Sequence, residues 1–342
     1  MADMLADTYS GPFTGSRAPG DTPASRATLL RVATIALIAH SAMSIFSAFA
    51  FATFLTPPLP AWLMTPTNQK VMAIGMQWGG QTTVVIGALA GLTFLGYCIG
   101  MRRALLVFAV SFVLSLSSEL AGTYTGYPFG EYKYSSLLGY KIAGLVPFNI
   151  PTSWFYMLVA SLAICGRILP ATDDSKSKWW WALVGGVVLT AWDVSMDPAM
   201  VKTVHWSWYV PDLSTRSTFE QFIGTPFFFG MPLTNWLGWL LTGILVARAM
   251  LAVVPPSVWA SAVSPSRFPL ALYAVNGALP IAICFAQDMV LAGVLGTIAM
   301  AVPLLLAFRS EGARNAPRPA RVPTGSTAPR ARGMSDVAVA GD

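Results

Sequence analysis

The sequence predicts an all-α integral membrane protein: a polytopic helical bundle of about eight transmembrane helices, with both termini cytoplasmic. Three observations predict this fold. Of the 342 residues, 55% are hydrophobic and only 11% are charged, whereas soluble chains have about 25% charged residues. The apolar residues gather in blocks of roughly 20 residues, which is the length of a membrane-spanning helix. Lys and Arg are concentrated in alternate connections between these blocks, as in other multi-pass membrane proteins.

Each apolar block is predicted to form one transmembrane helix. The fourth and fifth blocks have the clearest bounds, whereas only the polar pair Gln287 and Asp288 separates the seventh from the eighth. In chain order, the blocks are 33–54, 74–99, 103–121, 147–168, 179–197, 233–253, 268–286 and 289–308.

The distribution of basic residues gives the expected orientation. With both termini cytoplasmic, 16 of the 21 basic residues fall on the inner side, which predicts a multi-pass protein of the cell inner (cytoplasmic) membrane. The net charge of +6 is then explained by topology and by attraction to anionic lipid, with no nucleic-acid partner. The five basic residues left on the outer side are Lys70, Lys133, Lys141, Lys202 and Arg216.

The chain is expected to have one folded domain between two tails. Residues 1–28 are rich in Gly, Pro, Ser and Thr, and residues 310–342 in Arg, Pro and Gly. Both compositions are typical of disordered segments, so the transmembrane domain is expected at 29–309. Three cysteines without paired spacing fall in apolar blocks and are expected to be buried small hydrophobic residues. They are Cys98, Cys165 and Cys284.

Polar residues that interrupt the apolar blocks carry the functional information, because charged groups at membrane depth are costly and usually functional. In the expected topology, Asp193 and Asp197 fall at the outer end of the fifth block and Glu119 at the outer end of the third. Asn235 and Asp288 also fall on the outer side. We therefore expect one polar pocket that opens toward the outer leaflet.

Each acidic residue also has a plainer interpretation. Asp193 and Asp197 are four positions apart and would share a helix face, but Asp197 precedes Pro198 and could instead cap a following helix, ending the span near Met196. Glu119 could pair with Lys133 or Lys141. Asp288 could simply occupy a turn between two helices.

The two longest outer loops are unusually aromatic. Residues 122–154 are dense in Tyr, Phe, Gly and Pro, and 204–230 repeat the pattern. Interfacial aromatic belts explain part of this composition, but the glycines and prolines predict a defined, pocket-lining shape. Aromatic walls beside buried carboxyls suit a long apolar substrate, a transient cation, or both.

Missing motifs narrow the chemistry. The only histidines are His40 and His205. An iron-dependent membrane desaturase or hydroxylase needs more histidines than this to bind its metal. The two histidines also lie in different segments, so the sequence does not indicate a nucleophile–histidine pair. No GxGxxG fingerprint and no phosphate-binding glycine loop are present. We therefore expect acid–base chemistry by carboxyls, without a cofactor or metal.

Several patterns, in the same order along the chain, resemble those of a known family. The patterns are Glu119-x-x-Gly122, Gly126-Tyr-Pro-Phe-Gly130, Tyr132-x-Tyr134, Pro147–Trp154, Asp193-x-x-x-Asp197-Pro198, Trp206-x-Trp208 and Gly230-x-Pro232-x-x-Asn235-x-x-Gly238-Trp239. Together they resemble the membrane carotenoid-biosynthesis family that includes the gamma-carotene 1'-hydratase (1'-hydroxylase) and the bisanhydrobacterioruberin hydratase. The resemblance spans roughly residues 70–310.

The resemblance implies a carotenoid 1,2-hydratase (a hydro-lyase) that adds water across the terminal double bond of an acyclic carotenoid end. The acid must carry a proton at neutral pH, and burial beside a second carboxyl favours that form. We expect Asp193 to be the leading proton donor, with Asp197 or Glu119 acting on water or on the cation. The expected substrate-binding residues are Tyr124, Tyr127, Phe129, Tyr132, Trp154, Trp192, Trp206, Trp208, Asn235 and Asp288.

Two other function classes remain open. An intramembrane prenyltransferase also uses aspartates spaced as DxxxD, but it needs a second acidic motif, magnesium and a diphosphate substrate. A carotenoid-binding protein or proton-coupled transporter could use the same carboxyls without catalysis. No inverted repeat is evident, which disfavours a transporter.

Overall fold

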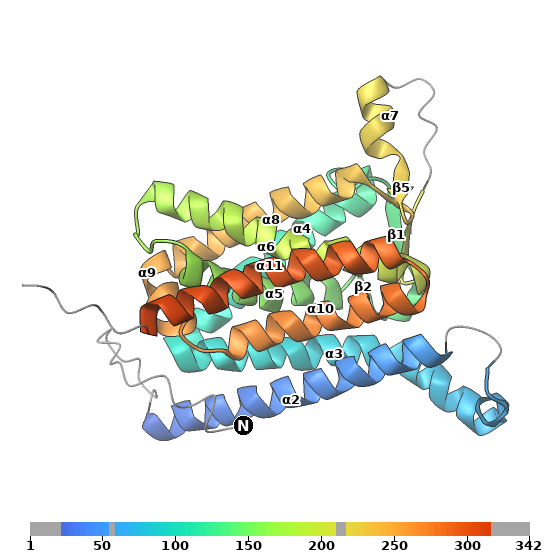
Figure 1. The fold of residues 1–342 in the computed structure, drawn as a ribbon, viewed down its shortest axis with the longest axis horizontal. Coiled ribbons are helices and arrows are strands. Elements are labelled where there is room, and N and C mark those ends of the chain that lie inside the picture. Colours follow the sequence, from blue (N-terminus) through green and yellow to red (C-terminus); the bar gives the residue numbers. More distant parts are fainter. Residues whose placement is uncertain (1–21, 55–58, 210–216, 316–342) are drawn as a thin grey trace, which may run out of the picture.

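The computed structural model describes residues 22–54, 59–209 and 217–315. Eight long helices run along a common direction and form one bundle (Figure 1). Every apolar block predicted above corresponds to one of them; 147–168 and 289–308 begin one or two residues before their helices, and the other six lie wholly inside. The long helices are α2 (Pro23–Phe54), α3 (Pro66–Ile99), α4 (Met101–Thr125), α5 (Asn149–Ile168), α6 (Ser175–Lys202), α8 (Leu233–Val253), α10 (Phe268–Ala286) and α11 (Val290–Asn315).

Seven of the eight long helices are apolar enough to cross a membrane, which indicates a multi-pass membrane protein. The exception is α6, where sequence analysis expected the fifth span. With 28 residues, it is about 42 Å long and could cross a bilayer. Its two N-terminal lysines and its two buried aspartates lower its apolar content. Helix α6 nevertheless packs inside the bundle, against α5, α8, α10 and α11.

The ends of several helices differ from the expected bounds. Helix α2 already begins at Pro23 and α11 continues to Asn315, so both helices extend into the expected tails. The rest of those tails, 1–21 and 316–342, lies outside the described residues.

Helix α6 does not end before Pro198, as the capping interpretation of Asp197 required. It begins at an N-cap, where the Asp174 carboxylate accepts a hydrogen bond from Ser177 N at 2.9 Å, and it continues through Pro198 to Lys202. Proline removes one hydrogen bond of the helix, but burial of this turn among neighbouring helices keeps it helical. Asp197 is therefore an interior helix residue.

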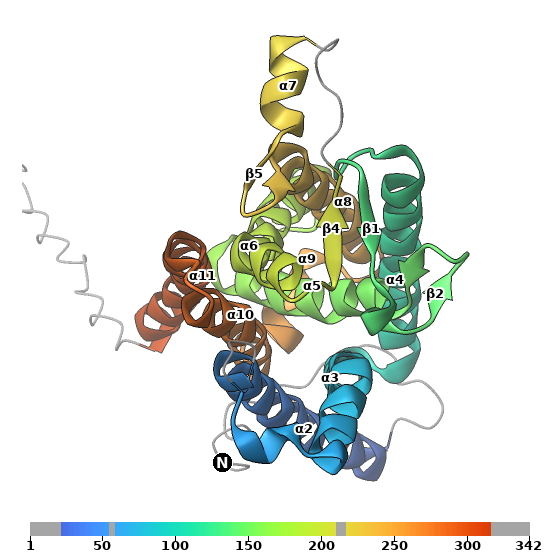
Figure 2. The ribbon, with the colours of Figure 1, turned by 90° about the vertical axis from the view of Figure 1, so that its right-hand side faces the viewer.

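Helix α5 lies at the centre of the bundle. Its residues are buried along nearly its whole length, and it contacts α3, α4, α6, α10 and α11. At its C-terminal end, Arg167 donates hydrogen bonds to the backbone carbonyls of Ser264 (2.6 Å), Pro265 (2.8 Å) and Ser266 (3.1 Å). Helices α2 and α3 pack against each other as a pair at one side of the bundle (Figure 2).

The described parts of the aromatic loops, at one end of the bundle, contain short antiparallel strands, which the all-α expectation did not include. Strand β1 (Tyr132–Tyr134) pairs with β4 (Trp206–Trp208), so that Tyr132 lies opposite Trp208 and Tyr134 opposite Trp206. The other pairs are β2 (Lys141–Ile142) with β3 (Val146–Pro147) and β5 (Pro226–Phe228) with β6 (Met231–Pro232). The short helical segments are η1 (Ala61–Met64), η2 (Ser136–Leu138), α7 (Thr218–Gly224), α9 (Pro256–Val258) and η3 (Trp259–Val263).

All three cysteines are free and buried, as expected. The α3–α4, α5–α6 and α8–α10 connections lie at the end of the bundle that holds α9 (Figure 1). The basic residues at or beside these connections are Arg102, Arg103, Arg167, Lys176, Lys178 and Arg267. The strand-containing loops lie at the opposite end (Figure 1).

Candidate active site

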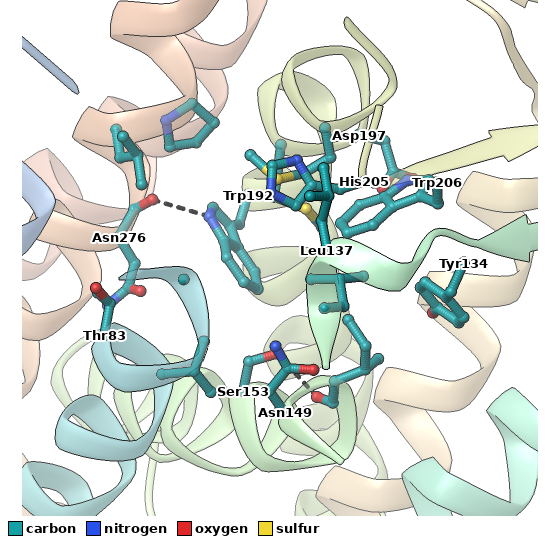
Figure 3. Close-up of a pocket in the computed structure, with 18 of the residues that line it drawn as sticks. Thr83, Tyr134, Leu137, Asn149, Ser153, Trp192, Asp197, His205, Trp206 and Asn276 are labelled. Atoms are coloured by element: carbon teal, nitrogen blue, oxygen red, sulfur yellow. Dashed lines mark hydrogen bonds between the residues drawn. The ribbon is translucent and has the colours of Figure 1, made fainter. Parts of the chain in front are cut away.

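A cavity of about 180 Å³ lies beneath the strand-containing loops. Its walls come from α2, α3, α4, α5, α6, α8 and α10, together with the residues of β1 and β4. Figure 3 shows part of this wall, with Trp192 between the side chains of Asn276 and Asp197. Glu119, Asp197 and Asn235, three of the polar residues expected to share one pocket, line this cavity.

Asp193 and Asp197 face the same neighbour, as their four-residue spacing predicted. Both are buried, and Asn235 at the start of α8 donates from Nδ2 to Asp193 Oδ2 at 3.0 Å and also to Asp197 Oδ2. The two carboxyls are also within hydrogen-bonding reach of each other. Two carboxyls in such contact attract only if one of them carries a proton. The arrangement therefore suits a pair that shares one proton.

The two aspartates differ in their access to the cavity. Asp197 is part of the cavity wall, where the Trp206 indole lies close to it. Asp193 is fully buried behind it and does not line the cavity, and its Oδ1 atom has no hydrogen-bond partner. A substrate in the cavity would therefore meet Asp197 first, although the sequence favoured Asp193.

Glu119 is the third carboxyl, and three donors surround it. Its Oε2 accepts hydrogen bonds from the hydroxyls of Tyr132 at 2.5 Å and Tyr134 at 2.7 Å, and its Oε1 from Trp154 Nε1 at 3.2 Å. The alternative pairing with a lysine is wrong. Among the described residues, Lys133 lies over the ring of Tyr209, at 4.9 Å from its centroid, and Lys141 Nζ donates to a backbone carbonyl.

The pairing of β1 with β4 explains how both tyrosines reach Glu119. Side chains alternate along a strand, so Tyr132 and Tyr134 project to one face while Lys133 between them is exposed. Burial and the neighbouring Glu119 raise the pKa of Tyr132 well above its usual value. The Tyr132 hydroxyl therefore keeps its proton at any physiological pH and remains a donor.

Tryptophan rings form much of the cavity wall. Trp154 of α5 stacks on Trp239 of α8, with centroids 4.5 Å apart and an interplanar angle of 19°. Trp192 of α6 meets Trp239 edge to face at 5.9 Å. The Trp192 indole also donates to the backbone carbonyl of Asn276 at 2.9 Å. These contacts fix the ring orientations from three helices, so the aromatic wall is preformed.

Most of the substrate-binding residues expected from the sequence line this cavity, but three do not. Tyr124 and Tyr127 are 83% and 73% exposed and lie outside it. Asp288 occupies the turn between α10 and α11 with φ of 59° and is exposed, so its plainer interpretation is the correct one. The expected residues that do line the cavity are Phe129, Tyr132, Trp154, Trp192, Trp206, Trp208 and Asn235.

His205 was not among the site residues expected from the sequence, but it also lines the cavity. Thr203 Oγ1 donates its proton to the Ala199 carbonyl at 2.8 Å, so it accepts from His205 Nδ1 at 2.7 Å. The Nε2 atom is then the unprotonated nitrogen. Burial lowers the pKa of His205 to about 4, so the ring is neutral at pH 7. The signal available in the sequence was its place beside the Trp206-x-Trp208 pattern.

His40 of α2 is the second histidine in the wall. Its Nδ1 lies 2.8 Å from the Thr83 carbonyl, which can only accept, so Nδ1 carries the proton. Its Nε2 then accepts from Asn276 Nδ2 at 3.0 Å. Both ring nitrogens are satisfied, which suits a structural role. No sequence signal joins His40 to Asn276, because they are 236 residues apart.

Comparison with known proteins identified one family and one curated relative. Residues 79–303 match the family model described as "Carotenoid biosynthesis protein". A bisanhydrobacterioruberin hydratase from Haloarcula japonica is 29% identical over 142 residues, which are 42% of this chain and 43% of that protein. The match thus spans less than half of the relative's length. No solved structure matches the chain.

Proposed function

The chain belongs to the carotenoid biosynthesis protein family, and from this membership we propose that it is an enzyme that adds water to the terminal 1,2 double bond of an acyclic carotenoid end group. The product would be a tertiary 1-hydroxy carotenoid. The relative from Haloarcula japonica is named as a hydratase, which supports this reaction class. The reaction consumes only alkene and water and needs no redox cofactor.

The observation that carries the proposal is the carboxyl pair of α6 at the wall of an aromatic cavity. Hydration of an unactivated alkene begins with proton transfer to carbon, which requires a buried, protonated acid and a site that tolerates a carbocation. Asp197 meets the first requirement, because it faces the cavity and contacts a second carboxyl that can share its proton. The tryptophan rings of the cavity wall meet the second requirement, because they can stabilise a carbocation.

In the first step, the Asp197 carboxyl gives its proton to C2 of the terminal double bond. The π electrons form the new C2–H bond and leave a tertiary cation at C1. In a pair that shares one proton, Asp193 is ionised during this step, so the negative charge of both carboxylates faces the cation at C1 once the proton has moved. This assignment exchanges the roles that the sequence alone gave to the two aspartates.

The cation then forms between groups that stabilise positive charge. The Trp154, Trp192 and Trp239 rings in the cavity wall can interact through their π faces, and Glu119 adds a carboxyl at the same wall. The three donors around Glu119 hold its carboxyl in place.

In the last step, water attacks C1 and the resulting oxonium loses a proton. A protonated alcohol is a strong acid, so a base of low pKa is sufficient. His205 is suited to this role, because its Nε2 is unprotonated, faces no other hydrogen-bond partner among the described residues and belongs to the cavity wall. Return of that proton to Asp197 through water completes the cycle. The net reaction is alkene plus water to alcohol.

The cavity size favours attack at the end of the substrate. A cavity of about 150 Å³ holds a molecule the size of benzene, and this one has about 180 Å³. It can hold the last few carbons of an isoprenoid chain but not a whole carotenoid. This fits a reaction confined to the terminal double bond.

The membrane arrangement is also part of the proposal. Helix ends with basic residues lie at one end of the bundle and the cavity loops at the other. By the positive-inside rule, the basic end faces the cytoplasm. Both termini would then be cytoplasmic and the cavity would lie toward the outer leaflet of the inner membrane.

Two alternatives predict different behaviour. A prenyltransferase would require magnesium and a diphosphate substrate, whereas the proposed hydration proceeds in the presence of a chelator. A carotenoid-binding or proton-coupled transport protein would bind pigment or move protons and leave the pigment unchanged.

Expression in a bacterial host that makes acyclic carotenoids tests the proposal. Extracted pigment should gain the mass of one water, and growth in ¹⁸O-labelled water should place the label in the product, whereas labelled dioxygen should not. Pigments that remain unchanged across several acyclic substrates would refute hydration. Label from dioxygen would identify an oxygenase instead.

A further inference from the structure

Small residues of α2 and α3 line one side of the cavity. Gly75 and Gly79 of α3 and Ser44 and Ser47 of α2 all belong to this wall. A Cβ atom added to Gly75 or Gly79 would meet no heavy atom within 4 Å. We call the space beside these four residues the glycine slot.

Other glycines of α3 behave differently. A Cβ on Gly87 would lie 2.9 Å from the His40 ring, and one on Gly91 would lie 3.0 Å from Cβ of Tyr156. These two glycines allow close helix packing. Gly75 and Gly79 serve no such contact, so packing does not explain their small size.

The glycine slot reaches the apolar outer surface of the protein. Gly75 lines the cavity and is also exposed, so the cavity opens to the outside at this point. The surface beside the opening is strongly apolar. It includes the exposed side chains of Ile45, Phe46 and Phe49 on α2 and of Ile74 and Trp78 on α3. In a multi-pass membrane protein, such a surface contacts lipid tails.

A second observation indicates that this cavity holds a ligand. Asn149 of α5 is part of its wall, is only 3% exposed, and has an Oδ1 atom with no hydrogen-bond partner. A buried acceptor without a donor is costly. Water or a hydroxyl group inside the cavity would satisfy it, as expected for the reactant and the product of a hydration.

We propose that the glycine slot binds the polyene chain of the substrate, with the reactive end in the cavity and the rest of the chain in the lipid. This inference rests on the proposed function, because it takes a long acyclic polyene as the ligand. The cavity holds only the end of such a molecule, so the chain must leave it. The open space beside Gly75 and Gly79 offers an apolar exit.

Pigment retention tests the slot separately from catalysis. The protein would be purified in mild detergent from cells that make an acyclic carotene, and the ratio of carotenoid to protein absorbance measured. Gly79→Leu fills the slot from α3, and Ser47→Phe fills it from α2. Ala73→Leu is the matched control, because Ala73 is exposed on the same helix and does not line the cavity. Gel filtration identifies the folded variants.

We expect folded Gly79→Leu or Ser47→Phe protein to lose at least tenfold in bound pigment, and Ala73→Leu to retain the wild-type ratio. Asp197→Asn should retain pigment and form no hydrated product. If folded Gly79→Leu and Ser47→Phe proteins bind as much pigment as the wild type, the glycine slot does not bind the polyene chain. Wild-type protein that binds pigment without hydrating it would overturn the proposed function and leave the slot supported.

Discussion

Gly238 of α8 faces the ring of Phe129 so closely that a Cβ atom at position 238 would lie 2.5 Å from Cδ1 of that ring. On the other side of the ring, a Cβ at Gly122 of α4 would lie 2.6 Å from Cδ2. Phe129 is buried and lines the cavity. The two glycines therefore form the space that holds a wall residue between two helices.

We predict that Gly238→Ala displaces Phe129. Overpacking a tight core costs about 1–3 kcal/mol, so the free energy of unfolding should fall by this amount and hydration should slow. Thermal denaturation in detergent measures the first effect. Gly80→Ala is the control with the opposite sign, because a Cβ there meets nothing within 4 Å and removing a helical glycine stabilises by about 0.4–1 kcal/mol. Equal melting temperatures for the two variants would show that a methyl group at position 238 does not overpack the site of Phe129.

Asparagine substitutions should distinguish the two aspartates. Asp197 faces the cavity and Asp193 lies behind it, so Asp197→Asn should reduce the rate of hydration by about 100-fold or more. Asp193→Asn should retain measurable activity, because the proposed donor remains. Product formation in membranes, normalised to protein amount, measures both. If Asp193→Asn is less active than Asp197→Asn, Asp193 is the proton donor, as the sequence alone suggested.

Removal of the Tyr132 hydroxyl should weaken the carboxyl site. Tyr132→Phe deletes the 2.5 Å hydrogen bond to Glu119, and removing one partner of a buried hydrogen bond costs about 1–3 kcal/mol. We expect a loss of stability within this range, together with slower hydration. Tyr140→Phe is the matched control, since the Tyr140 side chain is exposed. If both variants unfold at the same temperature, the Tyr132 hydroxyl does not stabilise the fold.

His205 should make stability depend on pH. Burial lowers the pKa of His205 to about 4, whereas an unfolded histidine titrates near 6.5. The folded state therefore binds fewer protons, and its stability falls as the pH drops from 6.5 toward 4. Between pH 7.5 and pH 5 the loss amounts to about 2 kcal/mol from this group. Melting curves of wild-type and His205→Gln protein at both pH values isolate this contribution, and identical pH dependence in the two proteins would disprove it.

The helices were largely predictable from the sequence, because a helix inside a bilayer needs about 20 apolar residues and such blocks are easily located. Each of the eight blocks corresponds to one helix, to within two residues at its start. The end of the fifth was wrong because proline is a poor helix residue in isolation, and the sequence does not show that neighbouring helices enclose Pro198. The short strands escaped prediction because β1 and β4 are distant in sequence and pair only in the fold.

The site was predictable where an energetic cost marks a residue. Asp193, Asp197 and Glu119 stand out because carboxyls are costly at membrane depth, and all three are buried together with Asn235. Tyr124 was misplaced because apolar patterning gives depth along a helix but not the face on which a side chain lies. His205 was missed because its neighbours in the cavity come from other helices.

The burial of two aspartates in α6 has a consequence for biosynthesis. Each carboxyl costs about 2.5–3.5 kcal/mol at the centre of a helix that enters the bilayer alone through the translocon, and α6 lacks the apolar content to offset this. In the folded protein, Asn235 of α8 donates a hydrogen bond to the buried Asp193. Asn235 leaves the ribosome 42 residues after Asp193. We therefore expect α6 to settle in the bilayer only after α8 has been synthesised, so that membrane insertion of these two helices is one cooperative event.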